Sequence, residues 1–140
     1  MRTIASLLFV LSLFTTGLYA QNNQNNKASS DTTIVFEVYE HNYGELDYGG
    51  DGTCTFTFTN KGTEPLILTN VRASCGCTTP SWTRDPIQPG EKGEIKVKYN
   101  TLIQGSFNKV VSVNSNGNPQ FIALRVKGLV KPRPVDTAQK

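Results

Sequence analysis

The feature that most constrains the fold of this sequence is a strict alternation of apolar and polar residues. Residues 53–59 read TCTFTFT, which places Cys54, Phe56 and Phe58 on one face and four threonines on the other. Residues 94–99, EIKVKY, alternate in the same way. Successive side chains of a β-strand point to opposite faces, so a period of two is typical of a half-buried strand. No stretch after residue 20 shows helical spacing, and the pattern therefore predicts an all-β protein.

Turn residues divide the chain into about seven short strands. Asn60-Lys61-Gly62, Pro86 to Gly90 and Asn116 to Pro119 are turn sequences, because Gly and Asn tolerate left-handed backbone angles and Pro presets φ. The predicted strands are residues 34–39, 43–46, 53–59, 66–71, 94–99, 107–114 and 121–127. Short strands at this spacing indicate one immunoglobulin-like antiparallel β-sandwich, with a small barrel as the alternative. Residues 74–86 are then the longest irregular connection.

The N-terminus has the layout of a secretory signal peptide. A positive start at Arg2 precedes an apolar run from Ile4 to Leu18 and a small residue, Ala20. We expect residues 1–20 to be removed, although Leu18 is larger than cleavage sites prefer. The run is short for a membrane span, so we expect no transmembrane segment. The protein is then exported to the periplasm or the extracellular cell envelope.

The remaining chain has room for one domain between two polar ends. Residues 21–32 form an Asn-rich segment and residues 131–140 a Pro-containing tail, and both compositions predict disorder. The domain is expected over residues 33–130. The net charge of +3 comes from the ends, since residues 31–130 carry 9 Lys and Arg against 10 Asp and Glu. A nearly neutral domain lacks the basic surface that nucleic-acid binding requires.

A set of motifs resembles a secreted bacterial family known as domain of unknown function 1573, which is common in Bacteroidetes. The resemblance covers roughly residues 43–130, and its most specific part is Ser74-Cys75-Gly76-Cys77-Thr78. The other motifs are Phe56-x-Phe58-x-Asn60-x-Gly62, Pro65-Leu66, Pro80-x-Trp82, Ile87-x-Pro89-Gly90 and Gly105-x-Phe107-x-Lys109. The flanking pattern is similar to immunoglobulin-like modules of the ASPM, SPD-2, Hydin and major-sperm-protein group. This resemblance implies a fold and an exported location, but no activity.

Three cysteines leave several pairings open. An odd number means that at least one of Cys54, Cys75 and Cys77 is not bonded within the chain. In an extended strand Cys75 and Cys77 would have α-carbons about 6.5 to 7 Å apart, at the edge of disulfide geometry, but Gly76 permits a tight bend. A bond from Cys54 to either of them would instead close a loop of roughly 20 residues. Cys54 is also a natural small core residue beside Phe56.

The same cysteines carry the alternative chemical readings. Cys75 and Cys77 could form a disulfide that stabilises the fold, a thiol redox pair or a soft-metal site. Cys54 is a possible third thiol. Zinc requires four ligands, but the two further donors, His41 and Cys54, are expected in an exposed loop and in the core, so we predict no metal. A Cu(I) site, which needs fewer ligands, stays open. Arg72 and Arg84 would lower a thiol pKa if the loop folded them inward.

The remaining residues of the sequence form no recognisable catalytic motif, so we predict a protein that is not an enzyme and needs no cofactor. His41 is predicted in an exposed loop, and no G-x-S-x-G or H-E-x-x-H motif occurs. Trp82, with Arg72 and Arg84, is a possible ligand contact, although a single Trp in a sandwich is often part of the core. The leading hypothesis is a binding or structural module of the cell envelope, whose partner is an envelope protein or glycan. The alternative is a thiol redox or copper-handling protein centred on Cys75-Gly76-Cys77.

Overall fold

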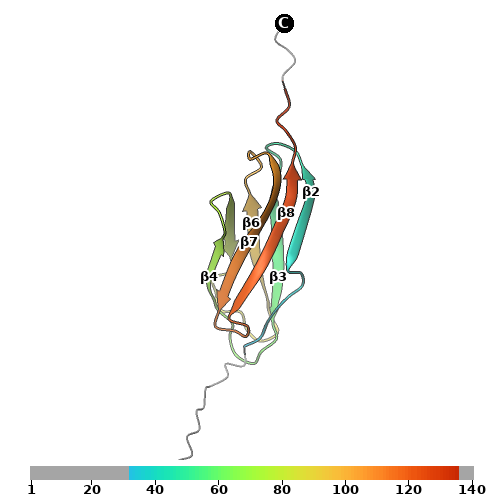
Figure 1. Ribbon diagram of the computed structural model, residues 1–140. Coiled ribbons are helices and arrows are strands. Elements are labelled where there is room, and N and C mark those ends of the chain that lie inside the picture. The colour runs from blue at the N-terminus through green and yellow to red at the C-terminus, as the bar shows by residue number, and fades with distance from the viewer. Residues whose placement is uncertain (1–31, 136–140) are drawn as a thin grey trace, which may run out of the picture.

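The protein folds into two layers of β-strands, described by a computed structural model over residues 32–135 (Figure 1). The strands are β1 (Ile34–Phe36), β2 (Glu40–Leu46), β3 (Thr53–Asn60), β4 (Leu68–Ala73), β5 (Thr78–Trp82), β6 (Lys92–Tyr99), β7 (Gly105–Ser115) and β8 (Phe121–Val130). One sheet has the order β1-β3-β6-β5 and the other the order β2-β8-β7-β4. This confirms the immunoglobulin-like β-sandwich, with eight strands in place of about seven.

Strand direction departs from the expected antiparallel arrangement at one place. All pairs are antiparallel except β2 with β8, which run parallel and match Glu40 with Arg125 and Leu46 with Val130. These two strands are far apart in sequence and no hairpin joins them. Since only a tight hairpin forces neighbouring strands to be antiparallel, an edge strand brought in from a distance is free to run either way.

The additional strand, β5, lies inside the stretch 74–86 that we expected to be irregular. Its sequence, TTPSW, contains a proline and has no clean apolar alternation, so the period of two gives no signal there. It forms because it pairs with β6 over five residues, from Thr78 opposite Tyr99 to Trp82 opposite Ile95. As the last strand of its sheet, β5 can hold Pro80, because an edge position need not donate a hydrogen bond on its outer side.

Other boundaries also differ from the predicted ones. Leu66 was expected to begin the fourth strand, but it forms an isolated antiparallel bridge with Ile87, and β4 begins at Leu68. His41 lies in β2 and is half-buried, whereas an exposed loop position was expected. The signal peptide expected over residues 1–20, most of the segment 21–32 and the end of the tail lie outside the described residues. Within residues 32–135 no helix is long and apolar enough to cross a membrane.

The core lies between the inner faces of the two sheets, as the alternation predicted. Cys54, Phe56 and Phe58 of β3 are buried, while the threonines between them face outward. They pack with Ile95 and Val97 of β6 and with the inward residues of the opposite sheet, among them Val111, Val113, Leu124 and Val126. Gly93 is required opposite Phe58, since a Cβ at Gly93 would lie 2.3 Å from the Phe58 ring.

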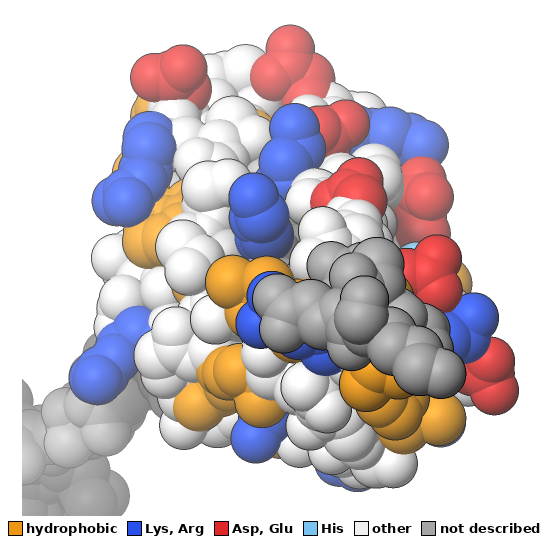
Figure 2. Space-filling view, turned by 90° about the horizontal axis from the view of Figure 1, so that it is seen from above, with side chains coloured by type: hydrophobic (Ala, Val, Ile, Leu, Met, Phe, Trp, Pro, Cys, Tyr) orange, Lys and Arg blue, Asp and Glu red, His pale blue; other side chains and the backbone are white. Residues whose placement is uncertain are grey.

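The described chain enters and leaves at opposite ends of the sandwich (Figure 1). Thr32 is held near the turn between β7 and β8, where its carbonyl accepts a 2.7 Å hydrogen bond from the amide of Asn118. Lys131, just after β8, donates its amide to the carbonyl of Leu46 at the other end. Seen from the latter end, the surface carries acidic and basic side chains interspersed, with apolar side chains between them (Figure 2). This distribution fits the nearly neutral domain expected from the sequence.

Asn60 is a fully buried polar residue whose amide group organises the end of the sandwich where the chain enters. Its Nδ2 donates to the carbonyls of Glu64 and Ile87 at 2.7 and 2.9 Å, and its Oδ1 accepts from the amide of Gly62 at 2.9 Å. Its own backbone pairs with Glu91 and Gly90. Asn60 therefore ties the turn after β3 to the segment that leads into β6.

Replacing Asn60 with alanine should destabilise the fold by about 3 kcal/mol, because it removes three hydrogen bonds and leaves buried partners unsatisfied. Urea unfolding checks this through a lower midpoint at an unchanged m value. The exposed Asn108 of β7 provides the matched control, and Asn108→Ala should change the free energy of unfolding by less than about 0.5 kcal/mol. Equal effects of the two substitutions would contradict the assigned role of Asn60.

Candidate functional site

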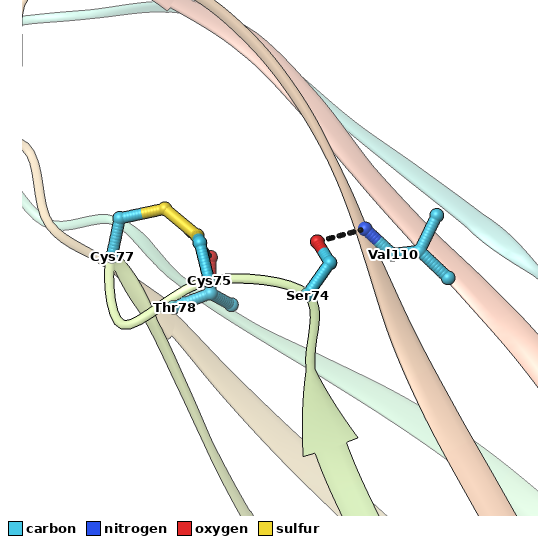
Figure 3. The surroundings of a disulfide bond; sticks show 5 residues. All are labelled: Ser74, Cys75, Cys77, Thr78 and Val110. Atoms are coloured by element: carbon cyan, nitrogen blue, oxygen red, sulfur yellow. Dashed lines mark hydrogen bonds between the residues drawn. A yellow bond between two sulfur atoms is a disulfide. The ribbon is translucent and has the colours of Figure 1, made fainter.

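The Cys75-Gly76-Cys77 segment lies where the chain passes from one sheet to the other. It follows β4, at the edge of one sheet, and precedes β5, at the edge of the other. Backbone hydrogen bonds fix both sides of the crossing. Ser74 donates its amide to the carbonyl of Val110 at 2.8 Å, and its hydroxyl accepts from the Val110 amide at 3.2 Å (Figure 3). On the far side, the Asn100 amide donates to the carbonyl of Cys77 at 2.8 Å.

Of the pairings that the sequence left open, the structure has a disulfide between Cys75 and Cys77 (Figure 3). Their α-carbons are 5.2 Å apart, which is shorter than an extended strand would give. The chain bends at Gly76, which is exposed and has open space where a Cβ would stand. The bend therefore brings two cysteines of one short segment within bonding distance.

The two sulfur atoms have different surroundings but share one polar neighbour. Cys77 packs against a small buried cluster formed by Tyr99, Phe107 and Val130, in which the Tyr99 and Phe107 rings stack at 3.7 Å. Thr78 is 4% exposed, and its Oγ1 lies 3.7 Å from the sulfur of Cys75 and 3.8 Å from that of Cys77. A buried hydroxyl thus sits beside both ends of the disulfide.

Cys54 lies apart from this pair, on the inner face of β3, and its thiol is free and buried. Burial raises the pKa of the Cys54 thiol, which keeps it protonated and unreactive at neutral pH. Tyr43 lies beside it and donates its hydroxyl to the carbonyl of Gly52 at 2.7 Å, linking β2 to the start of β3 across the two sheets. Burial also raises the pKa of Tyr43.

Trp82 and Arg84 come together, while Arg72 stays separate from them. The guanidinium of Arg84 lies 3.6 Å above the centre of the Trp82 ring, a cation–π arrangement, and the ring packs on the core. The indole N–H of Trp82 is buried without a partner among the described residues. Ser81, Trp82, Thr83, Glu94 and Lys96 line a shallow depression nearby. Arg72 and Arg84 are both exposed, so the structure does not fold them inward over the thiols.

Within residues 32–135, no three His, Cys, Asp or Glu side chains gather as a metal site would require. His41 stacks edge-on against Tyr43, with ring centres 4.5 Å apart, and lies on the strand β2. A disulfide has no thiolate to offer a soft metal, since it is the deprotonated thiol that coordinates. Copper binding at Cys75 and Cys77 would therefore require the bond to be reduced first.

Two features of possible functional value were missed in the sequence. Thr78 directly follows Cys77 in the sequence, but only the folded connection between β4 and β5, called the corner below, shows that its hydroxyl lies beside both sulfurs. The second is the apolar tip of the loop between β6 and β7, where Leu102 is 59% and Ile103 44% exposed. The adjacent apolar pair was visible in the sequence, but its exposure follows from the loop's place at the end of the sandwich.

The number of free thiols that are accessible to solvent can be measured by alkylation and mass spectrometry. We expect no labelled cysteine in the native protein, one in denaturant without reductant, and all three after reduction, because Cys54 is buried and the other two are bonded. Rapid labelling of Cys54 in the native protein would contradict the burial of its thiol. A bond that includes Cys54 would show in the same peptide map.

Reduction of the disulfide should cost the fold little. A bond that closes a ring of so few residues removes little entropy from the unfolded chain, and the chain-entropy model gives about 1.5 kcal/mol. Urea unfolding of the oxidised protein and of protein kept reduced should therefore give two cooperative transitions separated by about that free energy. Loss of cooperative unfolding on reduction would show that the corner depends on the bond.

Solved structures with the same fold come from proteins of different kinds. A protein of unknown function from Porphyromonas gingivalis W83 matches at a TM-score of 0.65 and 18% identity, over 73% of this chain and 48% of that chain. This protein thus spans about half the length of that relative. The ASH/PapD-like domain 7 of human CEP192 matches at a TM-score of 0.61 and 8% identity, over 76% and 89% of the two chains.

A third structure is a chaperone–adhesin complex, CsuC–CsuE of Acinetobacter baumannii. It matches at a TM-score of 0.52 and 10% identity, over 71% of this chain and 57% of that chain. At these identities the three likenesses show the fold alone. A search of curated proteins gives no match.

The family model described as protein of unknown function (DUF1573) matches residues 34–130, which run from the first residue of β1 to the last residue of β8. The matched range contains all the motifs that carried the resemblance, among them the Cys75-Gly76-Cys77 segment and the turn at Asn60. This chain belongs to the DUF1573 family.

Proposed function

We propose that the protein is an exported, non-enzymatic binding module of the bacterial cell envelope, and that it holds a protein partner through the loops at the end where β8 finishes. The observation that carries the proposal is the exposure of Leu102 and Ile103 at the tip of the loop between β6 and β7. Two adjacent apolar side chains that stay exposed on a hydrogen-bonded loop are available for the apolar core of a protein interface. We favour a protein over a glycan because this tip is aliphatic.

The tip is held in place by hydrogen bonds to the neighbouring loop. Thr101 is buried; its hydroxyl donates to the carbonyl of Gly50 at 2.6 Å, and its own carbonyl accepts from the amide of Gly49 at 3.1 Å. The side chain of Asn100 accepts from the amide of Leu102 at 3.0 Å. The Thr101 bonds join the β2–β3 and β6–β7 loops, and the Asn100 bond fixes the β6–β7 loop itself. A preorganised loop binds more tightly because it loses less conformational entropy on binding.

The surroundings of the tip suit an interface. Figure 2 views this end of the molecule, where apolar side chains lie among charged groups of both signs. The core of a protein interface is more apolar than its rim, and Leu102 and Ile103 would supply that apolar part. The structural relative that is itself a chaperone–adhesin complex supports protein binding by this fold.

Export and an envelope location are supported by two features. Residues 1–20 have the layout of a signal peptide, and disulfides are usual in exported proteins and rare in cytosolic ones. The sequence contains no recognisable hydrolase motif, which disfavours a hydrolase. The Porphyromonas relative comes from the bacterial group in which we expected the family.

Site-specific photo-crosslinking in the producing cells tests the proposed surface. A photoreactive residue at position 102 should give one discrete higher-mass adduct in the envelope fraction. The matched control is position 121, because Phe121 is 57% exposed and lies at the opposite end of β8. No adduct at either position, or equal adducts at both, would refute a partner at the β6–β7 tip.

A substitution that should prevent binding tests the same surface. Leu102→Asp should abolish the adduct formed from a photoreactive residue at position 103, because the charge remains solvated only if the tip stays in water. The free energy of unfolding should change by less than about 0.5 kcal/mol, since Leu102 is exposed. An unchanged adduct would place the contact elsewhere.

A further inference from the structure

We propose that the Cys75–Cys77 disulfide is a thiol–disulfide exchange site that accepts two electrons from the dithiol of another molecule, with Thr78 as its positioning residue. The proposal stands on the geometry of the corner between β4 and β5 and does not depend on the binding partner proposed above. Three observations carry it: the small ring, the independent support of the corner, and the hydroxyl beside the sulfurs.

The bond is not needed to hold the corner together. The segment before it is fixed to β7 by the Ser74 and Val110 hydrogen bonds, and the segment after it by the Asn100 amide on the carbonyl of Cys77. The amide of Thr78 also donates to the carbonyl of Cys75, closing the turn without the sulfurs. A three-residue ring restricts the unfolded chain little. The disulfide can therefore open and close while the fold persists, as a reversible exchange site requires.

The two sulfurs are not equally open to an incoming thiolate. One side of Cys77 is covered by the cluster of Tyr99, Phe107 and Val130, whereas Cys75 belongs to no buried cluster in the described part of the chain. Both residues are half-buried, and the bend at Gly76 between them is exposed. An external thiolate thus meets Cys75 first, and the Cys77 sulfur becomes the leaving group.

The exchange then proceeds in two balanced steps. The thiolate of the dithiol attacks Cys75 Sγ, forming a mixed disulfide and breaking the Cys75–Cys77 bond, and the released Cys77 thiolate takes a proton. The second sulfur of the dithiol, as a thiolate, then attacks the first dithiol sulfur, which is bonded to Cys75 in the mixed disulfide. This releases the Cys75 thiolate, which is also protonated. The dithiol is oxidised to a disulfide and the protein gains two thiols.

Thr78 assists because its hydroxyl can donate a hydrogen bond to the departing sulfur. Its Oγ1 lies within sulfur hydrogen-bonding distance of both cysteines, and the side chain is buried, where such a bond is stronger than in water. A leaving thiolate that accepts a hydrogen bond has a lower pKa, and a lower pKa makes it leave faster. Thr78 acts through the sulfurs and does not itself react.

The rate of reduction of the native protein by dithiothreitol tests the proposal. The wild type should be reduced much faster than it unfolds, Thr78→Val severalfold more slowly than the wild type, and Thr78→Ser, which keeps the hydroxyl, at nearly the wild-type rate. A purely structural role would not move the pH dependence, so the alkylation of Cys77 is followed against pH in the reduced proteins. Its midpoint should rise in Thr78→Val and stay unchanged in Thr78→Ser.

A monothiol identifies the sulfur that is attacked. After brief exposure to glutathione and quenching with iodoacetamide, peptide mapping should find glutathione on Cys75 and the alkyl group on Cys77. Glutathione on Cys77 would overturn the assigned direction. Reduction only at the rate of global unfolding, or equal rates in Thr78→Val and wild type, would overturn the exchange site or the role of Thr78.

Discussion

The structure depends on the burial of one face of each sheet against the other. Phe56, Phe58 and Ile95 present such a face from one sheet, and Val113 and Leu124 from the other. Neither sheet can cover its apolar face alone, so the chain has to supply strands to both layers. It does so by changing sheet at most of its connections, since only β5 to β6 and β7 to β8 join strands of the same sheet. The sheet-changing connections are where residues with special chemistry are placed.

The crossing from β4 to β5 shows how such a connection can carry chemistry at little cost to the fold. Its backbone is held at Ser74 and at Cys77 by bonds to β7 and to the residue after β6. Because those bonds position the segment, the disulfide contributes little to the stability of the fold. Its sulfurs, which lie beside the Thr78 hydroxyl, can therefore take part in exchange. The loop between β6 and β7 follows the same principle, since hydrogen bonds through Thr101 hold an apolar tip in solvent.

Much of the fold and part of the site could be predicted from particular residues. The alternation over 53–59 identified the inner face of β3 and the burial of Cys54. The Cys75-Gly76-Cys77 segment was expected in the irregular connection of residues 74–86, and Gly76 indicated that a bend could bring the sulfurs together. The strand β5 gave no local signal, because pairing with β6 creates it. The stacking of Arg84 on Trp82 was not predicted, because it depends on where the end of β5 lies in space.

The sequence by itself determined the β class, the inward faces, the turns and the position of the paired cysteines, because these follow from local spacing and from the backbone preferences of Gly, Pro and Asn. Only the tertiary structure decided that β2 runs parallel to β8, that Cys75 pairs with Cys77 while Cys54 stays free, and that Thr78 lies beside both sulfurs. The physical reason is that these are contacts between segments or side chains whose approach depends on the packing of the whole sandwich. Periodicity states which side of a strand is buried, but not which group it meets there.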